Sequence, residues 1–153
     1  MAKLTLSLGS NLGARSNALA AAREAIDLRL GTITYRSAII ETKAWGNTHQ
    51  PEFLNQLITC SLGAFGETAI EPTYLHRVLD TTQSIEAQLG RVRDQPWGPR
   101  TIDIDLIFLD DIRYEDHRLS LPHPWWRQRA FVTDLLPPGF DPYLRILDPA
   151  QLG

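Results

Sequence analysis

The strongest constraint on the fold of this chain is the order in which strand-like and helix-like hydrophobic patterns follow one another. Residues 3–8 alternate between leucine and polar side chains, which is the period of a half-buried β-strand. A helical pattern follows, with Ser16 as the expected N-cap and Gly31 as the expected end. Leu19, Ala22, Ile26 and Arg29 recur in it at helical spacing.

Two strand-like segments and a second helix come next. Residues 32–42 and 53–62 are rich in β-branched or apolar side chains and therefore predict two strands. Glu71 and Pro72 then open a helix that ends near Gly90, because proline is tolerated at the first helical position. The apolar stripe of this helix consists of Leu75, Val78, Leu79, Thr82, Ile85 and Leu89.

The last predicted strand covers residues 101–109 and is wholly apolar from Leu106 onward, as expected for a central strand. The order strand, helix, strand, strand, helix, strand indicates an α+β fold of ferredoxin-like type, with a hairpin and short helices after it. A chain of 153 residues, 43% of them hydrophobic, can bury one core. We therefore expect one domain spanning residues 1–153.

Charge and cysteine content exclude several classes of function. Lysine and arginine number 15 against 18 aspartates and glutamates, so there is no broad basic face for nucleic acid. Cys60 is the only cysteine, which rules out an internal disulfide or a cysteine metal cluster and suits a reducing cytoplasm. No stretch approaches the ~18 consecutive apolar residues of a membrane helix. We expect a soluble, cytoplasmic monomer without a membrane partner.

Asp103 and Asp105 are the residues to which the sequence assigns chemistry. They are two apart on a strand, so their side chains leave one face about 7 Å apart and can hold a divalent cation. Ile102, Ile104 and Leu106 point to the opposite face and anchor the strand. An Asp-x-Asp strand is more often a solvated surface. The neighbouring residues must therefore decide between the two interpretations.

A loop rich in arginine precedes these aspartates. Arg91, Arg93 and Arg100 can bind several phosphate oxygens, and Trp97 lies between them in the sequence. Magnesium usually takes one or two protein carboxylates and completes its shell with phosphates and water, whereas zinc would require histidine or cysteine. The combination predicts a site for magnesium and phosphates. The alternative is a surface cluster in which arginines and aspartates pair directly.

Other polar residues could bind the two substrates of such a site. Gln83 and Glu86 share a helix face and could hydrogen-bond a nucleotide, or they are ordinary exposed polar residues. Phe53 and Asn55 share a strand face and would suit a flat heterocycle, although core packing and a strand edge would also explain them. His123 could donate to a phosphate or only form a turn. The chain contains no P-loop and no Gly-x-Gly-x-x-Gly motif.

Three segments carry a family resemblance: residues 9–13 (GSNLG), 50–55 (QPEFLN) and 97–105 (WGPRTIDID). In this order they resemble 6-hydroxymethyl-7,8-dihydropterin pyrophosphokinases of folate biosynthesis, over residues 6–136. The resemblance implies that pyrophosphate passes from ATP to the hydroxymethyl oxygen of the pterin and that AMP is released. It also implies two magnesium ions held by Asp103 and Asp105.

The resemblance further implies the roles of individual residues. The catalytic residues would be Arg91, Arg100, Asp103 and Asp105. The ATP-binding residues would be Gln83, Glu86, Arg91, Arg93, Trp97, Arg100 and His123. The pterin-binding residues would be Thr42, Gly46, Phe53, Asn55, Trp97, Arg129 and Phe131.

Some positions depart from the usual family pattern. Ala44 replaces a proline, His49 an aspartate and Phe53 a tyrosine, while Pro124 and the long segment 63–71 are also unusual. These differences concern substrate affinity more than reaction class. Two alternatives stay open: a binding module that kept the fold and lost catalysis, and a pyrophosphokinase for another hydroxymethyl acceptor.

Overall fold

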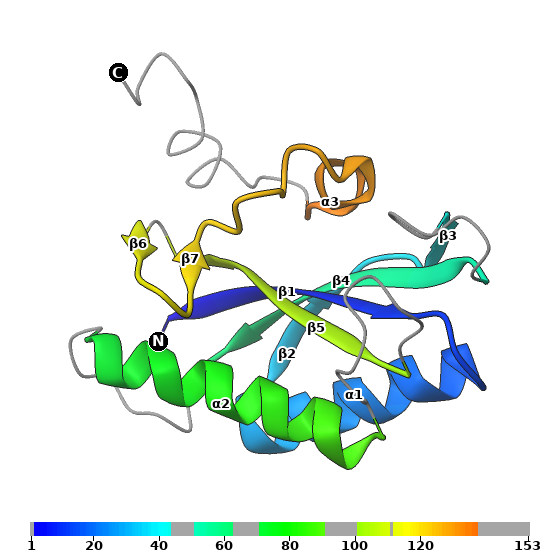
Figure 1. Ribbon diagram of the computed structural model, residues 1–153, viewed down its shortest axis with the longest axis horizontal. Coiled ribbons are helices and arrows are strands. Elements are labelled where there is room, and N and C mark those ends of the chain that lie inside the picture. Colours follow the sequence, from blue (N-terminus) through cyan, green and yellow to red (C-terminus); the bar gives the residue numbers. More distant parts are fainter. Residues whose placement is uncertain (1, 44–50, 63–70, 91–100, 111, 138–153) are drawn as a thin grey trace.

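The computed structural model describes residues 2–43, 51–62, 71–90, 101–110 and 112–137. Its centre is an antiparallel sheet in the order β2-β4-β1-β5, with β3 paired to the other end of β4 (Figure 1). The strands are β1 (Lys3–Ser10), β2 (Ile33–Arg36), β3 (Ile40–Thr42), β4 (Phe53–Ser61) and β5 (Asp103–Leu109). The sheet confirms the predicted α+β class, but β5, which was expected to be a central strand, lies at its edge.

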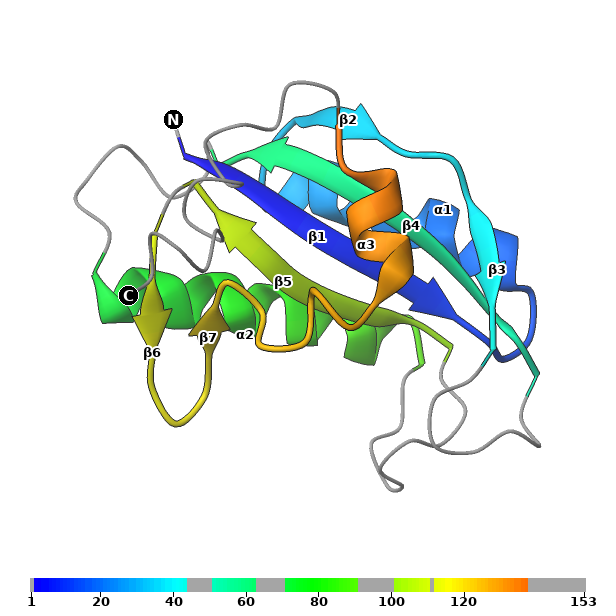
Figure 2. The same cartoon turned by 90° about the horizontal axis from the view of Figure 1, so that it is seen from above.

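Two helices cover one face of this sheet, and a shorter helix lies on the other. Helices α1 (Arg15–Arg29) and α2 (Pro72–Gln88) pack on the same side, while α3 (Ala130–Leu135) crosses the opposite face (Figure 1, Figure 2). Strands β6 (Tyr114–Glu115) and β7 (Ser120–Leu121) form a hairpin beside β5. No helix of the described segments is both long and apolar enough to cross a membrane.

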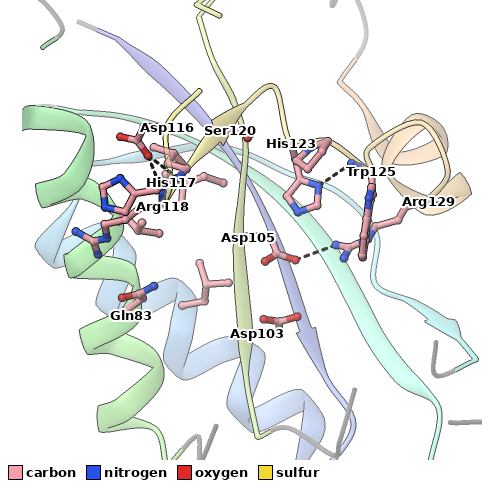
Figure 3. A pocket seen from close by; sticks show the side chains of 15 residues that line it. Gln83, Asp103, Asp105, Asp116, His117, Arg118, Ser120, His123, Trp125 and Arg129 are labelled. Atoms are coloured by element: carbon pink, nitrogen blue, oxygen red, sulfur yellow. Dashed lines mark hydrogen bonds and ion pairs between the residues drawn. The ribbon is translucent and has the colours of Figure 1, made fainter. Parts of the chain in front are cut away.

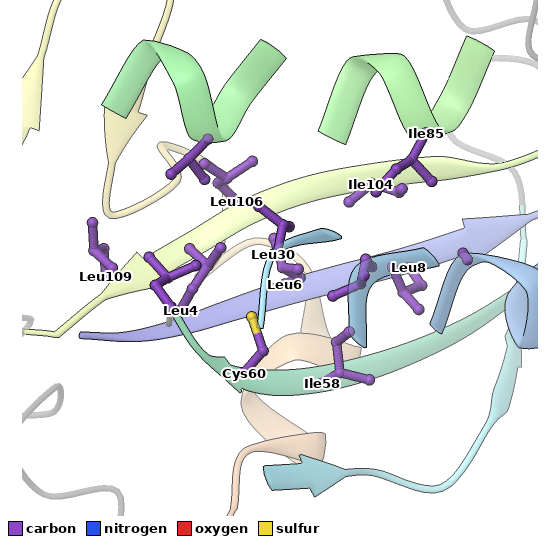
Figure 4. Close-up of a cluster of buried hydrophobic side chains, with 14 of the residues drawn as sticks. Leu4, Leu6, Leu8, Leu30, Ile58, Cys60, Ile85, Ile104, Leu106 and Leu109 are labelled. Carbon is purple, nitrogen blue, oxygen red and sulfur yellow. The ribbon is translucent and has the colours of Figure 1, made fainter. Parts of the chain in front are cut away.

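The main core lies between the sheet and the two long helices. Leu4, Leu6 and Leu8 of β1 are fully buried there, together with Ile26 of α1 and Ile85 of α2 (Figure 4). Burying a leucine of this kind stabilises the fold by about 1.5–3 kcal/mol. The alternation in residues 3–8 therefore correctly predicted the strand and its core face. The expected half-buried state is wrong, because Thr5 and Ser7 are also buried on the other face.

The start of α1 differs from the prediction. Ser16 is not the N-cap, because the helix begins at Arg15 and the capping residue is Ala14, whose side chain makes no capping hydrogen bond. Gly13 has a φ of 72°, a left-handed conformation that glycine adopts easily and that turns the chain into the helix. The Nη1 atom of Arg15 donates to the carbonyl oxygen of Glu52, 2.8 Å away. This tertiary contact ties the start of the helix to the residue before β4, although it supplies no acceptor in place of the predicted cap.

Arg29, the last of the four residues at helical spacing in α1, is not part of the core. Its guanidinium donates to Gln88 Oε1 at 2.9 Å and to Ser84 Oγ at 3.2 Å, so it bridges α1 and α2 at the edge of the core. The other three residues are buried, namely Leu19, Ala22 and Ile26. An arginine can bury its stem and keep its charged end at the surface, which explains the difference.

The single strand predicted over residues 32–42 is two strands. The chain leaves the ladder at Ser37, whose hydroxyl accepts from the Leu57 backbone N–H at 2.9 Å and donates to the Ala38 carbonyl at 2.8 Å. The Ser37 carbonyl accepts from Gln56 Nε2 at 2.8 Å. Side-chain bonds thus substitute for part of the strand ladder and separate β2 from β3.

Candidate active site

The face of the sheet that points away from α1 and α2 carries the polar residues singled out in the sequence. The strand register places Gly9 opposite Asp103 on one side and opposite Asn55 on the other. Ser7 lies opposite Asp105 in the next cross-strand row of this face. Asn55 and Asp103 are thus two strand spacings apart, which corresponds to about 10 Å between their Cα atoms. The predicted metal ligands and the predicted heterocycle site share one surface.

The two aspartates are half-buried on β5 and point to the same side of the strand (Figure 3). Asp105 Oδ2 accepts a hydrogen bond from Arg129 Nη1 at 2.8 Å. Ile104 and Leu106, between and beyond them, are buried in the core on the opposite face. This confirms the predicted geometry of the carboxylate pair and places the predicted Arg129 beside it.

His123 lies close to this pair and is held through its backbone and its ring. Its N–H donates to the Ile107 carbonyl at 2.9 Å, and its Nδ1 accepts from the Trp125 backbone N–H at 3.1 Å. Burial, reinforced by the charge of Arg129 and opposed by that of Asp103, lowers the pKa of His123 to about 4. The ring is therefore neutral at pH 7 and carries its proton on Nε2, where it can donate.

A cavity of about 480 Å³ opens between α2, β5 and the β6–β7 hairpin (Figure 3). It brings together five of the predicted site residues: Gln83, Asp103, Asp105, His123 and Arg129. Sequence reasoning missed Arg118 and Ser120, which line the same cavity. They alternate with the buried Leu119 and Leu121, so a period of two was the signal that could have found them.

The predicted heterocycle residues meet on the other side of β1. Asn55 is 5% exposed, and its Nδ2 donates to Thr42 Oγ1 at 2.5 Å. A Cβ atom placed on Gly9 would lie 3.3 Å from Asn55 Oδ1 and 3.4 Å from Phe53 Cδ1. Glycine thus keeps the surface beside the amide and the aromatic ring open, and the structure brings Thr42, Phe53 and Asn55 together as one group.

Two other predicted site residues, Glu86 and Phe131, are not among the residues that line the cavity. Glu86 is 1% exposed and accepts from the Ile104 N–H at 2.8 Å, so the alternative of an exposed helix residue is wrong for it. It fixes β5 to α2, and its contact with ATP stays a prediction. Phe131 of α3 is half-buried. It packs against a second apolar cluster, which consists of Leu57, Ile107, Phe108, Trp126 and Val132. The predicted residues Gly46, Arg91, Arg93, Trp97 and Arg100 lie outside the described residues.

The donor set at Asp103 and Asp105 fits magnesium better than zinc. Both ligands are carboxylates, which are hard oxygen donors, and both are partly accessible from the cavity. Within the described segments, no group of three or more histidines, cysteines, aspartates or glutamates could hold a metal. Two carboxylates leave the remaining positions of a magnesium shell to water and to phosphate oxygens.

Sequence comparison identifies relatives of the chain. The model of the 7,8-dihydro-6-hydroxymethylpterin-pyrophosphokinase family matches residues 5–137. Proteins named 2-amino-4-hydroxy-6-hydroxymethyldihydropteridine pyrophosphokinase are similar as well. The one from Methylorubrum extorquens is 41% identical over 133 residues, covering 86% of this chain and 78% of the relative. The one from Bacillus subtilis is 37% identical over 131 residues, covering 83% and 71%.

These similarities and the site define the class of the protein as an ATP-dependent pyrophosphokinase. The chain belongs to the 7,8-dihydro-6-hydroxymethylpterin-pyrophosphokinase family of folate biosynthesis. The resemblance based on the segments 9–13, 50–55 and 97–105 is thereby confirmed, and so is ATP as the co-substrate.

Proposed function

We propose that the polar face of the sheet is where this chain transfers pyrophosphate from ATP to 6-hydroxymethyl-7,8-dihydropterin and releases AMP. The observation that carries this proposal is the cross-strand row in which Gly9 separates Asn55 from Asp103. A separation of about 10 Å lets a pterin on one side reach phosphates held on the other. Reaction between two bound substrates depends above all on such positioning.

Asp103 and Asp105 would hold two magnesium ions in this proposal. When bound, magnesium stabilises the charge on the transferred phosphates. Arg129, which pairs with Asp105 in the structure, would turn to a phosphate oxygen once the carboxylate binds a cation. His123 would donate from Nε2 to a phosphate, and Arg118 would add a second guanidinium from the hairpin. No residue is assigned as a general base, because positioning and charge stabilisation dominate phosphoryl transfer.

The pterin would bind beside Asn55 with its ring against Phe53. The hydrogen bond to Thr42 fixes the Asn55 amide, so its Oδ1 atom is oriented to accept from a heterocycle edge. Phe53 offers a stacking surface, and Phe131 of α3 would cover the other side of the ring. Gly9 leaves room for the ring because it has no side chain.

Several broader predictions accompany this assignment. The strand order β5-β1-β4-β2 and the two helices on one face support a ferredoxin-like topology. A single domain over residues 1–153, a monomeric state and a cytoplasmic location stay predictions. The departures at Ala44, His49, Phe53 and Pro124 would change substrate affinity within the same reaction.

The nucleotide product tests the proposed reaction. The protein is mixed with ATP, Mg²⁺ and hydroxymethyldihydropterin, and the products are separated by chromatography. We expect one AMP for each pterin diphosphate, and ADP would contradict the proposal. Binding of both substrates without turnover would favour the lapsed binding module. AMP release with a different hydroxymethyl heterocycle, but not with this pterin, would favour the other acceptor.

A further inference from the structure

The turn of the β6–β7 hairpin is organised by one carboxylate, that of Asp116. Its Oδ1 atom accepts from the backbone N–H groups of Arg118 and Leu119 at 2.7 Å and 2.9 Å. Its Oδ2 atom accepts from the Tyr114 hydroxyl and contacts His76 Nε2 at 2.5 Å. Each oxygen thus has two partners, which uses the full acceptor capacity of a carboxylate.

The protonation states of Asp116 and Tyr114 determine which atom donates in each of these contacts. The hydrogen bond from Tyr114 is the main reason why the pKa of Asp116 lies well below its usual range, with smaller contributions from the Arg118 N–H and His76. The same bond raises the pKa of Tyr114. At neutral pH Asp116 is therefore ionised and Tyr114 protonated, so the Nε2 atom of His76 must be the donor.

His76 makes this carboxylate a link between two elements. It belongs to α2, 40 residues before Asp116 in the sequence, and its side chain is 26% exposed. A second link runs beside it, because Arg118 Nη2 donates to Asp80 Oδ1 of α2 at 2.7 Å. Two contacts thereby attach the hairpin to α2: His76 with Asp116, and Arg118 with Asp80.

Arg118 connects this cluster to the cavity. It lines the cavity with Asp103 and Asp105, on the side nearest α2 (Figure 3). Its N–H is fixed by Asp116, and the turn is closed by a bond from the Asp116 N–H to the Leu119 carbonyl at 2.9 Å. Without these backbone contacts, an arginine on a short hairpin would lose more conformational freedom when it binds a ligand.

We propose that Asp116 and His76 are positioning residues that hold Arg118 in the wall of the nucleotide cavity, where it binds a phosphate of ATP. The proposal rests on the function assigned above. Asp116 acts through Arg118 by fixing its backbone, and His76 acts through Asp116 by fixing the hairpin to α2. In the structure the Arg118 guanidinium pairs with Asp80, and it would turn to the phosphate when ATP binds. The fixed backbone improves affinity because less order has to be created on binding.

The first test compares the affinity for ATP with the affinity for the pterin. Asp116→Asn keeps an oxygen for the Arg118 N–H but replaces the oxygen that contacts His76 with a donor, and His76→Ala removes the same contact from the other side. Each should raise the Kd for ATP, measured by calorimetry, and the KM for ATP by about tenfold, the effect of losing one hydrogen bond to a charged group. The KM for the pterin and kcat should stay within about twofold. His76→Gln should restore most of the affinity, because its amide can donate to Asp116 in place of the imidazole.

The matched control is Glu115→Gln, which removes the same charge from the exposed neighbouring position of β6. It should leave the affinity for ATP unchanged. If the cluster only stabilised the fold, Asp116→Asn would lower kcat per mole of protein and leave both KM values unchanged. That result would overturn the proposal, and so would an equal loss of affinity in Glu115→Gln.

A double substitution tests whether the effect passes through Arg118. In an Arg118→Ala background, Asp116→Asn should raise the Kd for ATP no further, because the guanidinium it positions is gone. A further tenfold loss would refute the positioning role. These readouts are distinct from the reaction itself, since calorimetry measures ATP binding even if the product experiment finds no AMP.

Discussion

The two faces of strands β1 and β5 differ in composition and in partners. On β1, Leu6 and Leu8 point into the core between sheet and helices, whereas Gly9 lies on the polar face. On β5, Ile104 is buried in the same core, and Asp103 faces the cavity. One face of these strands therefore packs against the long helices, whereas the other carries the proposed site residues beside a smaller apolar cluster. Substitutions on the two faces should accordingly affect different measurements.

The largest effect is expected on the polar face. Asp103→Asn should lower turnover on the order of 100- to 1000-fold, because the carboxylate proposed to hold magnesium against the phosphates is lost. The thermal midpoint should change little, since the side chain is half-buried and outside the core. Asp134→Asn, at an exposed position of α3, is the matched control and should retain full turnover. Retained turnover in Asp103→Asn would remove the metal assignment.

The helix-covered face should respond in the opposite way. Leu6→Ala removes a fully buried side chain and should lower the free energy of unfolding by about 2–5 kcal/mol. Urea denaturation measures this loss, and Leu28→Ala is the control because Leu28 is 83% exposed. Turnover per folded molecule should stay near normal. If kcat fell as strongly as in Asp103→Asn, the two faces would not be separable.

A smaller effect is expected from Gly9, which lies between the two substrate regions. Gly9→Ala places a methyl group near Asn55 Oδ1 and the Phe53 ring, and these neighbours would have to shift. The KM for the pterin should rise about five- to tenfold, as is typical of mild overpacking. The Kd for ATP should change less. An unchanged KM for the pterin would show that the heterocycle binds elsewhere.

The smallest expected effect is the pH dependence of stability caused by His123. Its pKa falls from the ordinary 6.5 to about 4 in the folded protein. Between these two values the unfolded chain binds more protons, so stability is lost as the pH falls from about 6.5 to about 4. His123→Asn should therefore show a flatter decline in urea unfolding experiments across this window. Identical pH profiles for variant and wild type would contradict the buried, neutral state of the ring.

Local pattern predicted most of the fold because the strands and long helices have strong periodicity. Pro72 correctly marked the start of α2, and residues 53–62 correctly predicted β4. The pattern failed where a side chain from elsewhere decides the backbone, as Ser37 does between β2 and β3. Such contacts join residues about 20 apart and leave no local signal.

The candidate site was predictable to the extent that it lies on regular strands. Asp103, Asp105 and Asn55 could be assigned to a face by counting residues, and the register brings them together. Arg118 was missed because its hairpin strands have only two residues each. The alternation of residues 118–121 could have placed Arg118 beside Ser120, but the attachment of the hairpin to α2 depends on Asp116 and His76, which are far apart in the sequence, and no periodicity encodes that contact.

The central claim is that the carboxylates of the polar face carry the transfer without contributing to the stability of the fold. The most direct measurement is pterin-dependent AMP release by Asp105→Asn protein whose unfolding midpoint in urea is determined on the same preparation. We predict an unfolding midpoint close to that of the wild type together with AMP release reduced on the order of 100-fold or more. Wild-type AMP release by this variant would contradict the account.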